Sequence, residues 1–261
     1  MMRILCLHGR NQSGRIFEAH LEPAIKVFQG SESRVSFDFT DGPICCAELS
    51  ADGQPVYNFY AAPVIAEIRN AHEWLARKLD VDGPYDGVIA FSQGAALVSS
   101  YLLYQQWYEH EQAPPFKFAG FMSGSIPLDV LKSLGAQVSR AAERVVEETE
   151  LRRQGVLGPL PSHVSRARLA IFNSDDCFGL NLNKMPLELK IRVPTIHVWG
   201  QRDPEFPASI HLAGLCDPYI RKMHTHGDAH EVPQGVEDVS QLAQLILWCM
   251  QRAVWPGQSQ I

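Results

Sequence analysis

Ser92 is the residue of this chain whose surroundings most clearly suit chemistry. It stands in the segment Val-Ile-Ala-Phe-Ser-Gln-Gly-Ala-Ala, residues 88 to 96. The apolar run before Ser92 is typical of a buried strand, and Gly94 with the alanines after it is typical of a helix that starts at a tight turn. Ala90 stands where the usual Gly-x-Ser-x-Gly pattern has its first glycine, and alanine is small enough for such a turn. The segment therefore predicts a serine hydroxyl presented at a strand-to-helix turn.

A serine hydroxyl is a weak nucleophile near neutral pH, so it needs a base and a carboxylate that orients the base. Asp203 follows the apolar run 195–199, which places a carboxylate beyond the carboxyl end of a strand. His230 lies in a glycine-bearing segment ahead of the last helical pattern. Alone, Asp203 would fit an ordinary turn before Pro204, but the chain order Ser92, Asp203, His230 favours a catalytic triad. The other candidate acids are Asp175, Asp176 and Asp217.

Attack by such a serine also requires hydrogen-bond donors for the oxyanion that forms on the substrate carbonyl. Backbone amides suit this task because they are fixed before charge develops, and one donor is typically worth about 3 kcal/mol of barrier. The sequence predicts two of them: the amide of Gln93, directly after the nucleophile, and the amide of Arg10, in the loop after the first strand. The His8-Gly9 pair ahead of Arg10 would also fit a plain turn at the end of a strand.

A second reading of the same region is a metal site. His224, His226, Asp228 and His230 resemble the His-x-His-x-Asp-His string of metallo-β-lactamase-type hydrolases, in which imidazoles and a carboxylate hold zinc. Here Ala229 is inserted before the last histidine, and no histidine follows it to complete a ligand set. The sequence therefore favours the triad and predicts no metal and no organic cofactor.

Length and composition limit the class of protein. The chain has 261 residues, 46% of them apolar, which suits one large domain. The net charge is −6 and no long basic run occurs, so a nucleic-acid surface is not indicated. No signal peptide or membrane span is visible, and the scattered cysteines suggest reduced thiols, so we expect a cytoplasmic protein. The six cysteines are Cys6, Cys45, Cys46, Cys177, Cys216 and Cys249.

Apolar runs alternate with helical patterns along most of the chain, which predicts an α/β fold with a mainly parallel sheet and helices on both faces. Helical stripes begin at Ile65 and at Val239. The expected strands are Ile4–Leu7, Val35–Phe39, Gly87–Phe91, Phe118–Met122, Thr195–Trp199 and Ile220–His224.

The block from about 128 to 190 departs from this alternation. Leu128 to Glu150 predicts one long charged helix, and residues 154–190 show little periodicity. Because the block lies between two sheet strands, we interpret it as an insertion. It fits either a cap over the mouth of the active site or an ordinary crossover helix with a loop.

Segments spread along the whole chain resemble the fungal serine hydrolase family. The opening strand and its His8-Gly9 turn, the segment 37–43 and the segment 84–96 around Ser92 are similar to that family. So are the segments 194–203 and 230–233, which carry the acid and the base. Asp228 stands where relatives often have glycine, and Ala90 replaces the first glycine of the turn.

The resemblance implies an α/β-hydrolase fold over residues 1–261, with hydrolysis of esters or thioesters by Ser92, Asp203 and His230. It also implies a thioesterase that releases a polyketide or similar acyl chain from the acyl carrier protein of a fungal polyketide synthase, in secondary metabolism. Two alternatives stay open: a general carboxylesterase for small or lipid esters, and an inactive hydrolase scaffold used for binding.

Overall fold

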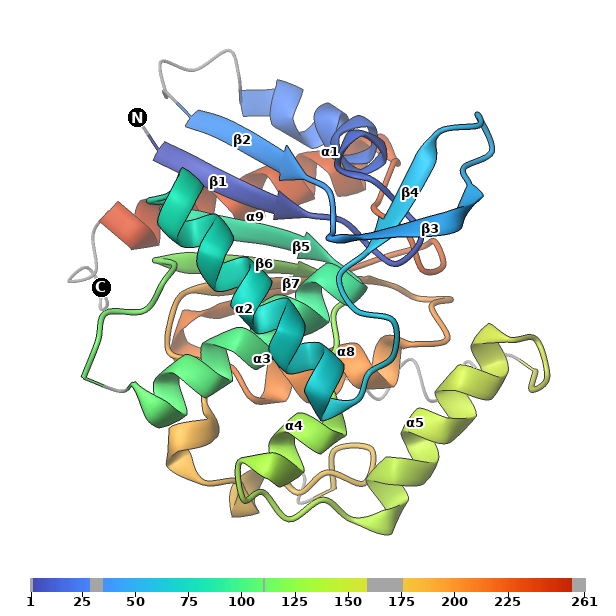
Figure 1. Ribbon diagram of the computed structural model, residues 1–261, viewed down its shortest axis with the longest axis vertical. Helices are drawn as coiled ribbons and strands as arrows, with labels where there is room; N and C mark the ends of the chain where they lie inside the picture. The colour runs from blue at the N-terminus through green and yellow to red at the C-terminus, as the bar shows by residue number, and fades with distance from the viewer. Residues whose placement is uncertain (1, 29–34, 110, 159–175, 255–261) are drawn as a thin grey trace.

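The computed structural model describes residues 2–28, 35–109, 111–158 and 176–254. Its centre is a parallel six-stranded sheet in the order β2-β1-β5-β6-β7-β8 (Figure 1). Every residue of the three central strands is buried, because helices cover both faces, and this explains their continuous apolar runs. All six predicted strands form. Their bounds are β1 Met2–Leu7, β2 Val35–Thr40, β5 Gly87–Phe91, β6 Phe118–Met122, β7 Thr195–Gly200 and β8 Arg221–His226.

Two apolar layers flank the sheet. Alternate strand residues such as Ile4 and Ile89 pack with helices α1 and α9 on one face. Their direct chain neighbours Leu5 and Val88 pack with α2 and α3 on the other face. This period of two follows from the pleat of the strands. The helices run as α1 Gly14–Phe28, α2 Ile65–Asp82, α3 Gln93–Tyr108, α8 Phe206–Gly214 and α9 Val236–Val254.

The chain builds the sheet outward from β1 in two directions, first to β2 and then through β5 to β8. The connection therefore reverses between the neighbouring strands β1 and β5. In open α/β sheets a crevice opens at such a point, outside the carboxyl ends of the strands. The loop after β1 and the turn after β5 both lie at this crevice.

A two-stranded antiparallel hairpin, β3 (Ile44–Leu49) with β4 (Pro55–Asn58), stands apart from the main sheet. The sequence did not indicate it, because most of β3 is exposed and carries no buried alternation. An isolated bridge between Gln12 and Tyr57 joins the hairpin to the loop after β1.

The single long helix predicted from Leu128 to Glu150 is wrong. The segment forms two helices, α4 (Leu128–Ser133) and α5 (Arg140–Arg153). Gly135 takes a left-handed φ of +83°, which ends the first helix. Ser139 then caps the second, because its side chain accepts a hydrogen bond from the amide of Ala142 at 3.1 Å. In Figure 1 α4 lies below α3 and α8, and α5 rises beside it at the lower right.

Further along the block 128–190, two short 3-10 turns lie at Leu182–Lys184 and Leu187–Leu189. Within the described parts of the chain, no helix is both long and apolar enough to cross a membrane.

Candidate active site

Ser92 lies directly after β5, at the sharp turn into α3. Its backbone has φ 49° and ψ −110°, a conformation that side-chain-bearing residues rarely adopt. Two hydrogen bonds hold the turn: the Ser92 amide donates to the carbonyl of Met122 at 2.9 Å, and the Gly94 amide donates to the carbonyl of His8 at 3.1 Å. A Cβ on Gly94 would stand 2.7 Å from the carbonyl oxygen of His8, so this position requires glycine.

Ala90, the departure from the usual serine pattern, does not belong to the turn itself. It is a fully buried residue of β5, paired with Leu7 on one side and Phe121 on the other. The alanine is thus accommodated by packing in the sheet, and it leaves the geometry of Ser92 unaffected.

Asp203 and His230 come from loops that follow β7 and β8, and they meet Ser92 at the carboxyl edge of the sheet. Nε2 of His230 lies 2.9 Å from Oγ of Ser92. Nδ1 of His230 lies 3.0 Å from each carboxylate oxygen of Asp203. Asp203 is 1% exposed, and the amide of Glu205 donates to its Oδ1 at 2.7 Å, which fixes the carboxylate.

The partners of His230 define its protonation. The carboxylate of Asp203 only accepts, so Nδ1 carries the proton, and Nε2 is left to accept the proton of the Ser92 hydroxyl. Burial, the largest influence, favours the neutral ring. The hydrogen bond to Asp203 and the charges of Asp203 and Glu205 outweigh burial, so the pKa of His230 lies above its ordinary value.

Gln93, whose amide is a predicted oxyanion donor, is the first residue of α3. The first amides of a helix have no partner within the helix, so this N–H is available to a ligand. The side chain fastens the neighbouring chain: Oε1 accepts from the Phe59 amide and Nε2 donates to the Tyr60 carbonyl, both at 2.9 Å.

Arg10, the other predicted donor, lies in the loop after β1, and it lines the same pocket as Ser92 and Gln93. The loop is held from inside by His8. Nε2 of that ring accepts from the Gly42 amide at 2.9 Å, so Nδ1 carries the proton and donates to the carbonyl of Gly9 at 2.6 Å. Burial lowers the pKa of His8, which keeps the ring in this neutral form.

A cavity of about 530 Å³ opens at Ser92. Tyr60, Pro63 and Phe91 give it apolar walls, while the last turn of α5 adds charged side chains. Among these, Arg153 forms an ion pair with Glu150, with Nε 2.8 Å from Oε2. Part of the predicted insertion therefore borders the same space as Ser92. The α5 residues concerned are Glu150, Arg152 and Arg153.

The other candidate acids lie elsewhere or are engaged locally. Asp176 accepts a hydrogen bond from the amide of Gly179, and Asp217 accepts one from the amide of Tyr219 at 2.9 Å. Asp175 lies outside the described residues. Neither described rival reaches His230.

The histidines of the proposed metal string do not converge. His224 pairs with Asp238 at 2.7 Å, His226 pairs with Asp228 at 3.4 Å, and His230 faces Ser92 and Asp203. Over the ranges that the structure describes, no group of three or more histidine, cysteine or acidic side chains is arranged to hold a metal ion.

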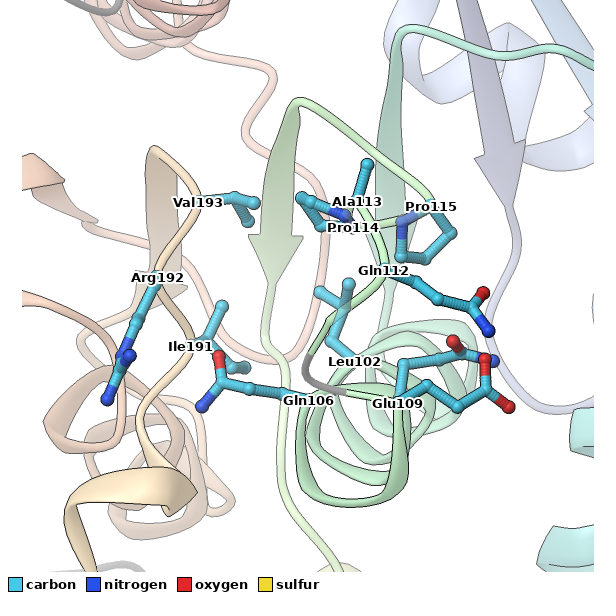
Figure 2. A pocket seen from close by; sticks show the side chains of 11 residues that line it. Leu102, Gln106, Glu109, Gln112, Ala113, Pro114, Pro115, Ile191, Arg192 and Val193 are labelled. Atoms are coloured by element: carbon cyan, nitrogen blue, oxygen red, sulfur yellow. The ribbon is translucent and has the colours of Figure 1, made fainter.

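A second cavity, of about 270 Å³, lies at the opposite end of the sheet (Figure 2). Leu102 and Gln106 of α3 form one wall, and the segments 112–115 and 191–193, which lead into β6 and β7, form the others. None of its lining residues is a serine, cysteine or histidine, so no nucleophile and base meet there.

Sequence reasoning missed two residues that share the pocket with Ser92. Glu205 follows Asp203 by two positions, and Tyr60 precedes α2 in a loop. The position of Glu205 just beyond the carboxyl end of β7 was a usable signal, because open α/β sheets place their sites there. Tyr60 had no such signal in the sequence.

The parallel sheet, its two helical layers and the serine turn define the class of α/β hydrolases. Solved structures agree on this fold. SOBER1 of Arabidopsis thaliana aligns with a TM-score of 0.52 at 16% identity, over 96% of this chain and 98% of that one. An epoxide hydrolase of Bacillus megaterium aligns with a TM-score of 0.54 at 11% identity, over 96% and 94% of the two chains.

Sequence comparison gives the particular family. Residues 1–242 match the family model described as serine hydrolase (FSH1), so the chain belongs to that family and is a serine hydrolase. The esterase alnB of Emericella nidulans is 27% identical, with 97% of this chain and 98% of the relative covered. The esterase FPY3 of Fusarium mangiferae is 28% identical, with 97% and 99% covered. The predicted fold class and the predicted resemblance are confirmed.

Proposed function

We propose that Ser92 is the nucleophile, His230 the general base and Asp203 the residue that orients the base. The observation that carries this proposal is the continuous chain of hydrogen bonds from Ser92 through His230 to Asp203. The same chain speaks against an inactive scaffold, because no reacting group is missing.

The steps follow from these contacts. His230 takes the hydroxyl proton as Oγ of Ser92 attacks the acyl carbonyl, and the amides of Gln93 and Arg10 hold the oxyanion. His230 then gives its proton to the leaving alcohol or thiol. Water, deprotonated by the same ring, attacks the acyl-enzyme. The bond between the acyl carbon and Oγ then breaks, His230 returns the proton to Oγ of Ser92, and the carboxylic acid leaves. Side chains, amides and water supply every group that these steps use.

The substrate is an acyl ester or thioester, and we propose a thioester of an acyl chain carried on an acyl carrier protein. A thiol leaves with little need for protonation, so a thioester is an easy substrate for this site. The family membership and the similarity to fungal proteins named as esterases support ester-type chemistry. A general carboxylesterase is the second candidate, and the names of the relatives favour it.

We also propose that α5 acts as a cap. Its last turn borders the pocket, while only Ala142 and Thr149 of the helix are buried. A helix with so little buried surface is weakly held and can move to admit a large acyl chain.

The six free cysteines support a reducing compartment, in keeping with the proposed cytoplasmic location.

A competition between matched substrates tests the substrate class. We would measure kcat/KM for one acyl group as a carrier-bound thioester, as a thioester of N-acetylcysteamine and as an oxygen ester. The proposal predicts the order carrier-bound, then free thioester, then oxygen ester. Equal values for the two free substrates, with no gain from the carrier, would establish a general carboxylesterase instead.

A further inference from the structure

Glu205 places an unengaged carboxylate beside the catalytic groups. Its backbone amide is bonded to Asp203, while its side chain lines the pocket that contains Ser92 and His230. Among the residues that the structure describes, this carboxylate has neither a hydrogen-bond donor nor an ion-pair partner. A half-buried carboxylate in an open pocket is hydrated in the free enzyme, so its oxygens can accept a hydrogen bond from a ligand that displaces this water.

Tyr60 contributes a second polar group to the same pocket. The residue is 6% exposed, and its phenol hydroxyl makes no hydrogen bond within the described ranges. Its backbone carbonyl accepts from Nε2 of Gln93 at 2.9 Å. Because Gln93 follows Ser92 directly, this bond fixes the position of Tyr60 relative to the nucleophile.

Charges around Glu205 restrict the kind of ligand. Arg153 lines the pocket but is engaged by Glu150, and Arg10 and Arg152 are also part of the lining. These guanidinium groups repel a cationic ligand, while the carboxylates of Glu205 and Glu150 repel an anionic one. A neutral group that can both donate and accept a hydrogen bond fits best.

We propose that Glu205 and Tyr60 form a polar subsite that binds a hydroxyl group of the substrate, so that the enzyme prefers hydroxylated acyl substrates. The inference rests on the proposed function, since it concerns what the same pocket accepts. The hydroxyl donates to the carboxylate of Glu205 and accepts from the phenol of Tyr60. Glu205 is a specificity residue in this account and takes no part in bond breaking.

Burial, the largest influence, raises the pKa of Glu205, and the charge of Asp203 adds to this rise. The positive charges of His230 and Arg153 act in the opposite direction. Glu205 in turn raises the pKa of His230 and of Tyr60. Neutralising Glu205 therefore changes the pH profile of catalysis, which a residue with a purely structural role would not do.

The test compares N-acetylcysteamine thioesters of hexanoate with the same thioesters carrying one hydroxyl at successive carbons. The wild-type enzyme should prefer at least one hydroxylated member by about tenfold or more in kcat/KM, the gain of a hydrogen bond to a charged group. Glu205→Leu and Tyr60→Phe should each bring this ratio close to one, mainly through KM. An unchanged ratio in both variants, or no preference in the wild type, would overturn the subsite.

Two further variants separate a loss of the Glu205 charge from a general effect of mutation. Glu205→Gln keeps the shape and removes the charge, so it should retain part of the preference and move the acidic limb of the pH profile to lower pH. Glu237→Gln, an exposed change in the first turn of α9, is the matched control and should alter neither. Fluorophosphonate labelling of wild-type Ser92 separates the two proposals: absence of labelling refutes the catalytic assignment, whereas labelling without a hydroxyl preference refutes the subsite alone.

Discussion

At the scale of single residues, His230 shows how the surroundings set the chemistry of one side chain. Asp203 holds the proton on Nδ1, which leaves Nε2 facing Oγ of Ser92 at 2.9 Å. The same contact stabilises the charged imidazolium form of the ring, and this is why the pKa of His230 is raised in spite of burial. Because only the neutral ring can accept a proton, a raised pKa moves the pH range in which His230 can act as a base upward.

The pH dependence of catalysis follows from this shift. His230 must be neutral to accept the proton of Ser92, so kcat/KM should fall as the pH drops through the pKa of His230. Because that pKa is raised, the fall should be centred above 6.5, the ordinary value of histidine. Asp203→Asn should move the limb to lower pH and lower kcat by about 10⁴-fold, through loss of the correct tautomer. A limb centred below 6.5 in the wild type would contradict the assignment.

At the scale of elements, the sequence predicted which residues lie at the carboxyl edge of the sheet, but it did not predict that the segment 128–153 forms two helices. The strands β5 and β7 are apolar runs buried on both faces, and Ser92 and Asp203 follow them directly. His230 follows β8, a more exposed strand at the edge of the sheet. Their positions in the chain therefore predict that they share one edge. The break between α4 and α5 depends on the conformation of Gly135, and the apolar stripe from Val130 to Val145 concealed it.

The proposed role of α5 as a lid over the pocket can be tested at this scale. Ser139→Ala removes the N-cap hydroxyl that accepts a hydrogen bond from the Ala142 amide, and this should cost about 1 kcal/mol of local helix stability. A loosened α5 closes less firmly over a bound acyl chain. We therefore expect KM for a bulky acyl thioester to rise up to about fivefold, and KM for a small acetyl ester to stay unchanged. Ser240→Ala in α9 serves as the control. Equal changes for both substrates would show that α5 is an ordinary crossover helix.

At the scale of the whole molecule, the reversal of the chain between β1 and β5 creates the site. It brings the Arg10 loop beside the turn that carries Ser92, while the loops after β7 and β8 bring Asp203 and His230 to the same edge of the sheet. Sequence order predicted that Arg10, Ser92, Asp203 and His230 lie near one another, because each of them follows a strand. Sequence order did not predict that Glu205 and Tyr60 line the same pocket, because the position of Tyr60 depends on how the loop before α2 folds back onto Gln93.

Active-site labelling of the intact enzyme tests the proposed role of Ser92 as the nucleophile. Fluorophosphonate should add to the wild-type protein once, with the adduct on Ser92 by peptide mass spectrometry. Ser92→Ala should take no label and should lose at least about a thousandfold in kcat while its unfolding temperature stays close to that of the wild type. A folded Ser92→Ala variant that keeps its label or its turnover would show that Ser92 is not the nucleophile.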